Sequence, residues 1–230
     1  MQDLIGVGLY TPAEAGKLLG IPARKITRWL KGHVVDGKQY AALWSAQVSL
    51  GDDQIYLGFR DLMETRVVHA FIRNGVPPVR IRSAIELARE VIAKDHPLST
   101  NRFKTAGREI FLQVIEMDED GVERERLLNL FKRQYEFNGI LDPILREVDF
   151  GDDEYPSRWW PIGRRANIVV DPERSFGTPI DAESSVPTRV LAVAGANMGA
   201  RPAARAYEVR ETAVRRAMEF EETLGQRLAA

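Results

Sequence analysis

The sequence predicts a mainly α-helical protein with small β-hairpins, an α+β fold. Apolar residues recur at helical spacing in several stretches. Turn signals at Asp36-Gly37 and Gly163-Arg164-Arg165 each lie between short apolar runs, as in hairpins. The 230 residues are 44% hydrophobic, enough for one large core or for two to three small ones. We expect three units, at 1–98, 99–157 and 158–230.

The chain is organised around two predicted short helices between Tyr10 and Lys31. Thr11 can cap the first helix, and Glu14, three residues later, completes a capping box with it. Gly20 supplies a stop, and the chain becomes helical again after Pro22. Two short helices about a tight turn are typical of a helix-turn-helix unit.

The second of these helices separates an apolar face from a cationic one. Ile26, Trp29 and Leu30 share one side, and the other side carries Arg24, Thr27, Arg28 and Lys31. Arginine can reach phosphates and the acceptor edge of guanine, and threonine can bond a phosphate or touch a thymine methyl. A solvated amphipathic helix has the same pattern, but the cap, the glycine turn and the basic face together favour DNA binding.

A small wing is predicted after the second helix. Asp36-Gly37 is a hairpin turn signal, and Lys38 beside it could reach a phosphate or simply be solvated. We expect Tyr40, Leu43 and Trp44 to pack beneath this wing.

Two helices should follow the wing and mount it on the rest of the chain. An apolar stripe from residue 59 to 72 predicts a helix that ends at Gly75, with Asp61 and Glu64 near its start, where acidic residues favour the helix dipole. Pro77-Pro78 begins the next helix.

The middle unit is expected to combine a β-hairpin, acidic loops and a helix. Residues 103–105 and 110–112 flank Ala106-Gly107-Arg108 like the strands of a hairpin. An acidic turn is expected at 117–122, and then a helix that closes near Gly139. The polar stretch 151–157 is expected to be an exposed linker or loop, with a domain boundary near it.

The C-terminal unit is predicted to contain a hairpin and three helices. The hairpin surrounds the turn at 163–165, and the helices start at a Thr188 cap, near Pro202 and near Arg210. In the last helix Glu211, Arg215 and Glu219 pair opposite charges at i, i+4 steps. A neutralised face is a poor phosphate binder, so this unit is predicted to bind protein or dimerise rather than read DNA.

Charge supports an N-terminal nucleic-acid site. The formal net charge is −1, so affinity for DNA has to come from a local basic region. Residues 1–40 hold six basic and three acidic residues, whereas residues 116–154 hold five basic and thirteen acidic ones. The chain has no cysteine and no apolar run of membrane-spanning length, so we expect a cytoplasmic protein that does not associate with membranes.

An enzymatic function is not expected. The three histidines, His33, His69 and His96, lack ligand spacing, and there is no glycine-rich phosphate loop or nucleophile pattern. The clustered acids at 118–120 and 152–154 are expected to be solvated loops rather than a cation site. We predict no cofactor and no metal.

Two regions resemble known families. The N-terminal region resembles MerR-like winged helix-turn-helix regulators. The resemblance lies in residues 10–29, Y-T-P-A-E-A-G-K-L-L-G-I-P-A-R-K-I-T-R-W, and in residues 60–82, R-D-L-M-E-T-R-V-V-H-A-F-I-R-N-G-V-P-P-V-R-I-R. The small helix-turn-helix domain of VapB-type antitoxins resembles V-V-D-P-E-R-S-F-G-T-P-I at 169–180, V-P-T-R-V-L at 186–191 and A-A-R-A-Y-E-V-R-E-T-A-V-R-R-A-M-E-F at 203–220. Residues 181–185 are acidic and polar where that domain has a glycine-rich or basic stretch, which argues against DNA contact at this end.

The resemblance implies an antitoxin of a type II toxin–antitoxin system. Such a protein neutralises a PIN-domain ribonuclease toxin and represses its own operon, here as a homodimer on double-stranded operator DNA. The expected DNA contacts are Thr11, Arg24, Lys25, Thr27, Arg28, Lys31 and Lys38. Because a PIN-domain ribonuclease holds its metal with carboxylates, an antitoxin can inhibit it by offering a cation. The candidates are Arg201, Arg205, Arg210 and Arg215, which could also be merely solvated.

The alternative is a stand-alone MerR-like transcriptional regulator. It would bind an effector or a protein partner at the middle or C-terminal region, around Phe103, Phe111, Phe131 and Phe137, unless those aromatic residues form core.

Overall fold

The computed structural model describes residues 6–116, 127–128, 130–131 and 134–229, and it confirms a mainly helical fold with small antiparallel sheets. The helices are α1 (Pro12–Leu19), α2 (Ala23–Lys31), α3 (Phe59–Arg73), α4 (Pro78–Ile92), α5 (Asn101–Glu116), α7 (Gln134–Leu145), α8 (Thr188–Met198), α9 (Ala200–Ala206) and α10 (Glu211–Ala229). The strands are β1 (His33–Val35), β2 (Lys38–Tyr40), β3 (Val148–Phe150), β4 (Pro156–Trp159), β5 (Ile168–Val170) and β6 (Pro179–Asp181).

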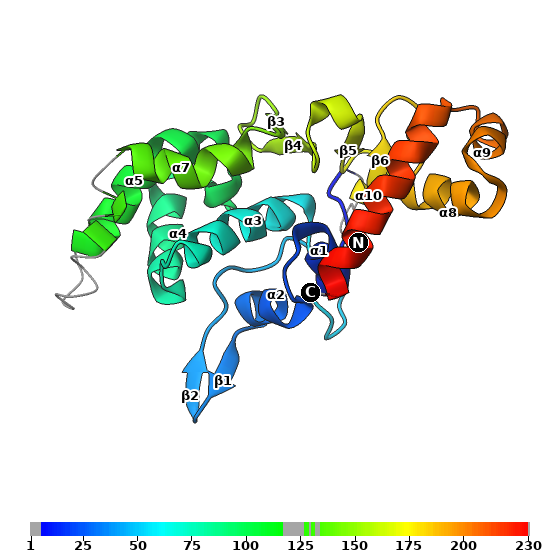
Figure 1. The fold of residues 1–230 in the computed structure, drawn as a ribbon. Coiled ribbons are helices and arrows are strands. Elements are labelled where there is room, and N and C mark those ends of the chain that lie inside the picture. Colours follow the sequence, from blue (N-terminus) through cyan, green and yellow to red (C-terminus); the bar gives the residue numbers. More distant parts are fainter. Residues whose placement is uncertain (1–5, 117–126, 129, 132–133, 230) are drawn as a thin grey trace.

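The elements form two helical groups on either side of a small sheet (Figure 1). Helices α3, α4, α5 and α7 make one group, and α8, α9 and α10 make the other. Strands β3, β4, β5 and β6 pair in that order, all antiparallel, between the two groups. The hairpin predicted around 163–165 is confirmed by the pairing of Trp159 with Val170, and it forms part of this larger sheet.

Five phenylalanine rings fill the core of the first helical group. They come from α3, α5, α7 and the chain just before α7, and all are fully buried: Phe71, Phe103, Phe111, Phe131 and Phe137. Phe111 stacks on Phe131 with ring centroids 4.7 Å apart. These aromatic residues are therefore core and do not line an open effector site.

The predicted hairpin at residues 103–112 is wrong, because this stretch is part of helix α5. Phe103, Gly107, Ile110 and Phe111 share one buried face at helical spacing. A Cβ atom at Gly107 would lie 2.8 Å from the rings of Phe103 and Phe137. The glycine thus makes room for two aromatic rings and does not mark a turn.

One further expectation in the middle of the chain needs correction. The helix expected to close near Gly139 continues to Leu145, with Pro143 inside its last turn. The stretch 151–157, expected to be an exposed linker or loop, is a loop from β3 into the start of β4, with residues 151–153 exposed and Asp153 paired with Arg60 at 3.2 Å. The boundary expected at 157 falls inside β4, and the division into three units stays a prediction. The acidic turn expected at 117–122 lies outside the described residues.

The C-terminal helices have a core of their own, made largely of alanine, valine and leucine: Leu191, Ala194, Ala203, Ala204, Ala213, Val214 and Ala217. The predicted cap at Thr188 is wrong, since Pro187 precedes the helix and Thr188 is its buried first residue. The Thr188 hydroxyl instead donates to Glu221 of α10 at 2.6 Å. None of the helices in the described part of the chain has the length and apolar character that crossing a membrane requires.

Candidate DNA-binding surface

Helix α1 and the turn after it have the predicted local structure. The Thr11 hydroxyl accepts a hydrogen bond from the amide of Glu14, and the Glu14 carboxylate accepts one from the amide of Thr11 at 2.8 Å. Gly20 closes the helix with a φ of 68°. A Cβ at Gly16 would lie 2.5 Å from the backbone oxygen of Ile21, so the two helices can approach this closely only with glycine there.

Helix α2 has the predicted apolar and cationic faces. Ile26, Trp29 and Leu30 are buried in the main core. Arg24, Arg28 and Lys31 are exposed on the opposite side, and within the described part of the chain they have no ion pair or side-chain hydrogen bond. Their cationic groups are therefore available to a ligand.

The other three predicted contacts near α1 and α2 are partly engaged within the protein. The Lys25 ammonium lies 5.3 Å from the centroid of the Trp29 ring. The Thr27 hydroxyl donates to the carbonyl of Ala23 at 3.0 Å, which leaves it able only to accept. Thr11 is exposed, with its side chain in the capping box.

The wing follows α2 as a tight hairpin, and Figure 1 shows it extending beyond α2, away from the helical groups. Asp36 and Gly37 have positive φ values of 49° and 75°, the geometry of a type I′ turn. Lys38 is exposed, with its ammonium 5.6 Å from the Tyr40 ring. Tyr40 itself is exposed and stacks on His33, so the expectation that it packs beneath the wing is wrong.

The base of the wing is tied to the helices by backbone contacts. Gly32 has a φ of 75°, and a Cβ there would lie 2.4 Å from the carbonyl oxygen of Tyr40. The amide of Leu43 donates to the carbonyl of Trp29 at 2.7 Å. Arg82 of α4 donates to the carbonyls of Ala41 and Ala42, a contact that no local sequence pattern predicted.

A buried acidic residue anchors the chain that follows the wing. The Asp61 carboxylate accepts from the indole of Trp44 at 2.9 Å and from the amides of Gln47 and Gly58 at 2.8 and 2.9 Å. Asp61 and Glu64 are fully buried, so they do not merely favour the helix dipole.

His96 lies against these two acids, with Nδ1 2.8 Å from Glu64 and 3.6 Å from Asp61. Burial raises the pKa of both carboxyl groups. Burial alone would lower the pKa of His96, but its hydrogen bond to Glu64 and the two nearby negative charges raise it overall. The three side chains form a charged cluster that joins α3 to the segment after α4.

The candidate toxin contacts fall into two pairs. Arg201 and Arg205 are exposed one turn apart on α9, with no ion pair recorded in the described ranges. Arg210 lies 3.4 Å from Glu183, and Arg215 lies 2.6 Å from Glu211. The Glu211–Arg215 pair confirms the first of the two predicted i, i+4 steps.

Two proteins and one solved structure, all three from Mycobacterium tuberculosis, are similar to this chain. The chain is 29% identical over 199 residues to a protein named "Putative antitoxin VapB45", with 82% of each chain covered. It is 33% identical over 92 residues to the uncharacterized protein Rv2308, covering 40% of this chain and 37% of that protein. The crystal structure of Rv2018 superposes with a TM-score of 0.72 at 27% identity, covering 94% of this chain and all of the other. No family model matches the sequence.

Proposed function

We propose that this protein is the DNA-binding antitoxin of a type II toxin–antitoxin system. It neutralises a PIN-domain ribonuclease and, as a homodimer, represses its own operon. The observation that carries the proposal is the exposed cationic face of α2 beside a projecting β-hairpin, in a chain whose relative over 82% of its length is named as an antitoxin.

The DNA-binding part of the proposal assigns a winged helix-turn-helix role to α1, α2 and the β1–β2 hairpin. Arg24 and Arg28 enter the major groove from α2, while Lys31 and Lys38 bind phosphates on either side. Thr27 donates its hydroxyl proton within the helix, so its contribution is the methyl group and one acceptor. In a homodimer, two such helices reach successive major grooves about one helical turn apart.

A binding titration with the duplex upstream of the gene tests this role. Arg28→Ala should weaken binding by roughly 1–3 kcal/mol and reduce the dependence on salt. The matched control is Arg102→Ala, which removes an exposed arginine from α5 on a distant part of the molecule. Equal affinities and equal salt slopes for the two variants would remove α2 from the DNA interface.

The toxin-binding part rests on the second helical group. Arg201 and Arg205 have exposed guanidinium groups on one face of α9, which suits a carboxylate-lined metal site. Arg210 and Arg215 already pair with acids of their own chain, so they are the weaker candidates.

Co-purification with the product of the neighbouring gene tests the partner. The double variant Arg201→Glu/Arg205→Glu should lose the toxin but keep its affinity for the upstream duplex. Arg102→Glu should retain both. Failure of the wild-type protein to capture the neighbouring gene product would defeat the antitoxin assignment, and it would leave the DNA-binding result standing on its own.

A further inference from the structure

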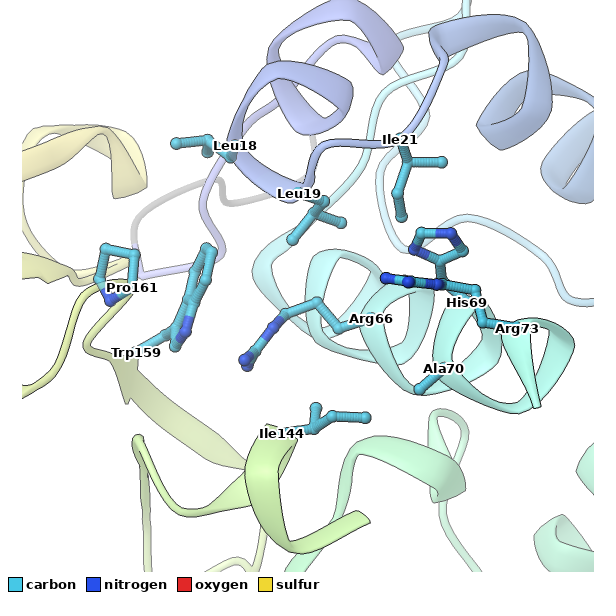
Figure 2. Close-up of a pocket in the computed structure, with 10 residues that line it drawn as sticks. All are labelled: Leu18, Leu19, Ile21, Arg66, His69, Ala70, Arg73, Ile144, Trp159 and Pro161. Atoms are coloured by element: carbon cyan, nitrogen blue, oxygen red, sulfur yellow. The ribbon is translucent and has the colours of Figure 1, made fainter. Parts of the chain in front are cut away.

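A cavity of about 300 Å³ lies where α1, α3, α7 and β4 meet. Figure 2 shows nitrogen-bearing side chains of α3 around it, with Trp159 and Ile144 on other sides. The basic residues are Arg66, His69 and Arg73, whose spacing puts them on one face of the helix. No acidic side chain lines this space among the described residues.

Arg66 is the unusual member of this group. Its guanidinium carbon lies 4.4 Å from the centroid of the Trp159 ring, and one nitrogen approaches the Met63 sulfur at 3.6 Å. Within the described ranges it forms no ion pair with a carboxylate. Burial lowers the pKa of Arg66 to about 9, and this desolvation opposes its charged form. A cation held in this way gains most from an anion placed beside it.

The positive charges near Arg66 also favour an anion in the cavity. The pKa of His69 is lowered by burial and then by the positive charges of Lys25 and Arg73. A negative charge in the cavity would therefore meet a positive electrostatic environment from several residues at once. The remaining lining residues are apolar or aromatic, among them Leu19 of α1, Ile144 of α7 and Trp159 of β4 (Figure 2).

We propose that this cavity binds a small organic anion, with its carboxylate or phosphate group at Arg66 and Arg73 and its apolar body between Trp159, Ile144 and Leu19. The volume is at the lower end for small-molecule sites and fits a compact, ring-sized ligand. The site differs from both the DNA-binding surface and the toxin-binding surface.

One of the residues that line the cavity packs against the buried face of α2. His69 lies with its ring 6.3 Å from that of Trp29, the aromatic residue on the buried side of α2. Binding of an anion beside α3 can therefore shift the position of α2 relative to α3. Any effect of the anion on affinity for operator DNA rests on the proposed function. Binding of the anion to the cavity does not depend on it.

Binding is tested with benzoate and phenyl phosphate as anions, benzamide as their neutral match and inorganic phosphate as an anion without an apolar body. NMR of the full chain with 15N-labelled indoles follows the Trp159 signal during titration. Both organic anions should shift it saturably, and benzamide and inorganic phosphate should bind at least about tenfold more weakly, roughly 1.4 kcal/mol.

Three variants connect binding to the cavity. Arg66→Met should weaken benzoate binding about tenfold, and Arg73→Gln should weaken it about threefold. The matched control Arg165→Gln, an exposed arginine of the turn after β4, should bind as the wild type does. Arg73 is exposed, so its variant and the benzamide comparison give an answer even if Arg66→Met does not fold.

Several results would overturn the proposal. They are the absence of saturable binding by either organic anion, equal binding of benzamide or of inorganic phosphate, and an equal loss in Arg165→Gln. Loss of duplex DNA binding in Arg66→Met without any small-anion binding would assign the arginine to a DNA phosphate instead. Because the titration contains no DNA or toxin, its failure is independent of the proposed antitoxin function.

Discussion

Two glycines in helices have opposite surroundings. Gly16, in α1, would place a Cβ 2.5 Å from the backbone oxygen of Ile21, whereas Gly139, in α7, has nothing within 4 Å of that position. Neither has a positive φ value. The surroundings alone therefore decide what an added methyl group does at each position.

Gly16→Ala should destabilise the protein by roughly 1–3 kcal/mol, because the turn into α2 has to move to relieve the contact. Gly139→Ala, its matched control, should stabilise by up to about 1 kcal/mol, since alanine is the better helix former. Urea unfolding of the two variants gives both values. Stabilisation by Gly16→Ala would mean that α1 and α2 are not as close as described.

His96 is buried among charged side chains, and burial by itself lowers its pKa. It faces Glu64 and Asp61, which raise its pKa, and Arg60, which lowers it. A raised pKa in the folded state means that the imidazolium form contributes stability below the ordinary value of 6.5. That contribution is lost as the pH rises through the pKa of the folded state.

NMR titration of the imidazole signals should therefore find His96 protonated to higher pH than His69, whose pKa is lowered. The free energy of unfolding should fall as the pH rises above 6.5. In Glu64→Gln the titration of His96 should move down and the loss of stability with pH should become smaller. A wild-type His96 that titrates below 6.5 would contradict this account of the cluster.

The sequence predicted residues well where a local rule applied. The pairing of Thr11 with Glu14 and the Asp36-Gly37 turn depend on atoms a few residues apart, and both are present. Gly107 was misjudged because one of the two rings that require a glycine there belongs to Phe137, thirty positions away. The ion pair of Glu64 with His96 has the same origin, since no local spacing connects two residues on separate elements.

At the scale of elements, the wing depends on α3 through one carboxylate. Asp61 holds the indole of Trp44 and the amides of Gln47 and Gly58, and these contacts fix the chain that returns from β2 to α3. The wing hairpin has only three residues in each strand, so its orientation depends on this anchor together with the contacts of Leu43 and Arg82 at its base.

Asp61→Asn should destabilise the protein by roughly 2–4 kcal/mol, because an amide cannot accept from all three donors in a buried site. Asp95→Asn is the matched control on an exposed loop and should change stability by less than about 0.5 kcal/mol. Thermal or urea unfolding decides between the two. A loss of stability as small as that of the control would mean that the three donors find other hydrogen-bond partners in the variant.

Helices were predicted correctly from the sequence where the apolar pattern fitted a helix and not a strand. Helices α1, α2, α3 and α4 have a cap or a proline at or before their start, and these four and α10 each have a single apolar stripe. Helix α5 is rich in phenylalanine, isoleucine and valine, which also suit strands, and only its packing on α4 and α7 decides for helix. The cavity beside Arg66 could not be predicted, because four separate elements contribute its walls.

In the whole molecule, contacts join the beginning of the chain to its last third. The Tyr10 hydroxyl donates to the carbonyl of Gly177 at 2.8 Å, and the amide of Leu9 donates to the carbonyl of Phe176 at 3.1 Å. Burial raises the pKa of Tyr10, so it stays neutral and keeps donating. These bonds tie the chain before α1 to the turn between β5 and β6.

Tyr10→Phe should therefore destabilise the full chain by roughly 1–2 kcal/mol, because the carbonyl of Gly177 loses its buried donor. Tyr207→Phe, at an exposed tyrosine of the C-terminal group, should have almost no effect. Differential scanning calorimetry gives both shifts. An unchanged melting temperature for Tyr10→Phe would show that the hydrogen bond between Tyr10 and Gly177 does not contribute to stability.

Helix α10 extends from the C-terminal bundle to α1, where Lys17 pairs with Glu221 at 3.4 Å. Its nineteen residues span about 28 Å as a single rod. A tilt of the C-terminal helices is thus transmitted along one continuous helix to α1, the neighbour of α2. Under the proposed function, a partner bound at the C-terminal helices and DNA bound at α2 change each other's affinity by the same factor.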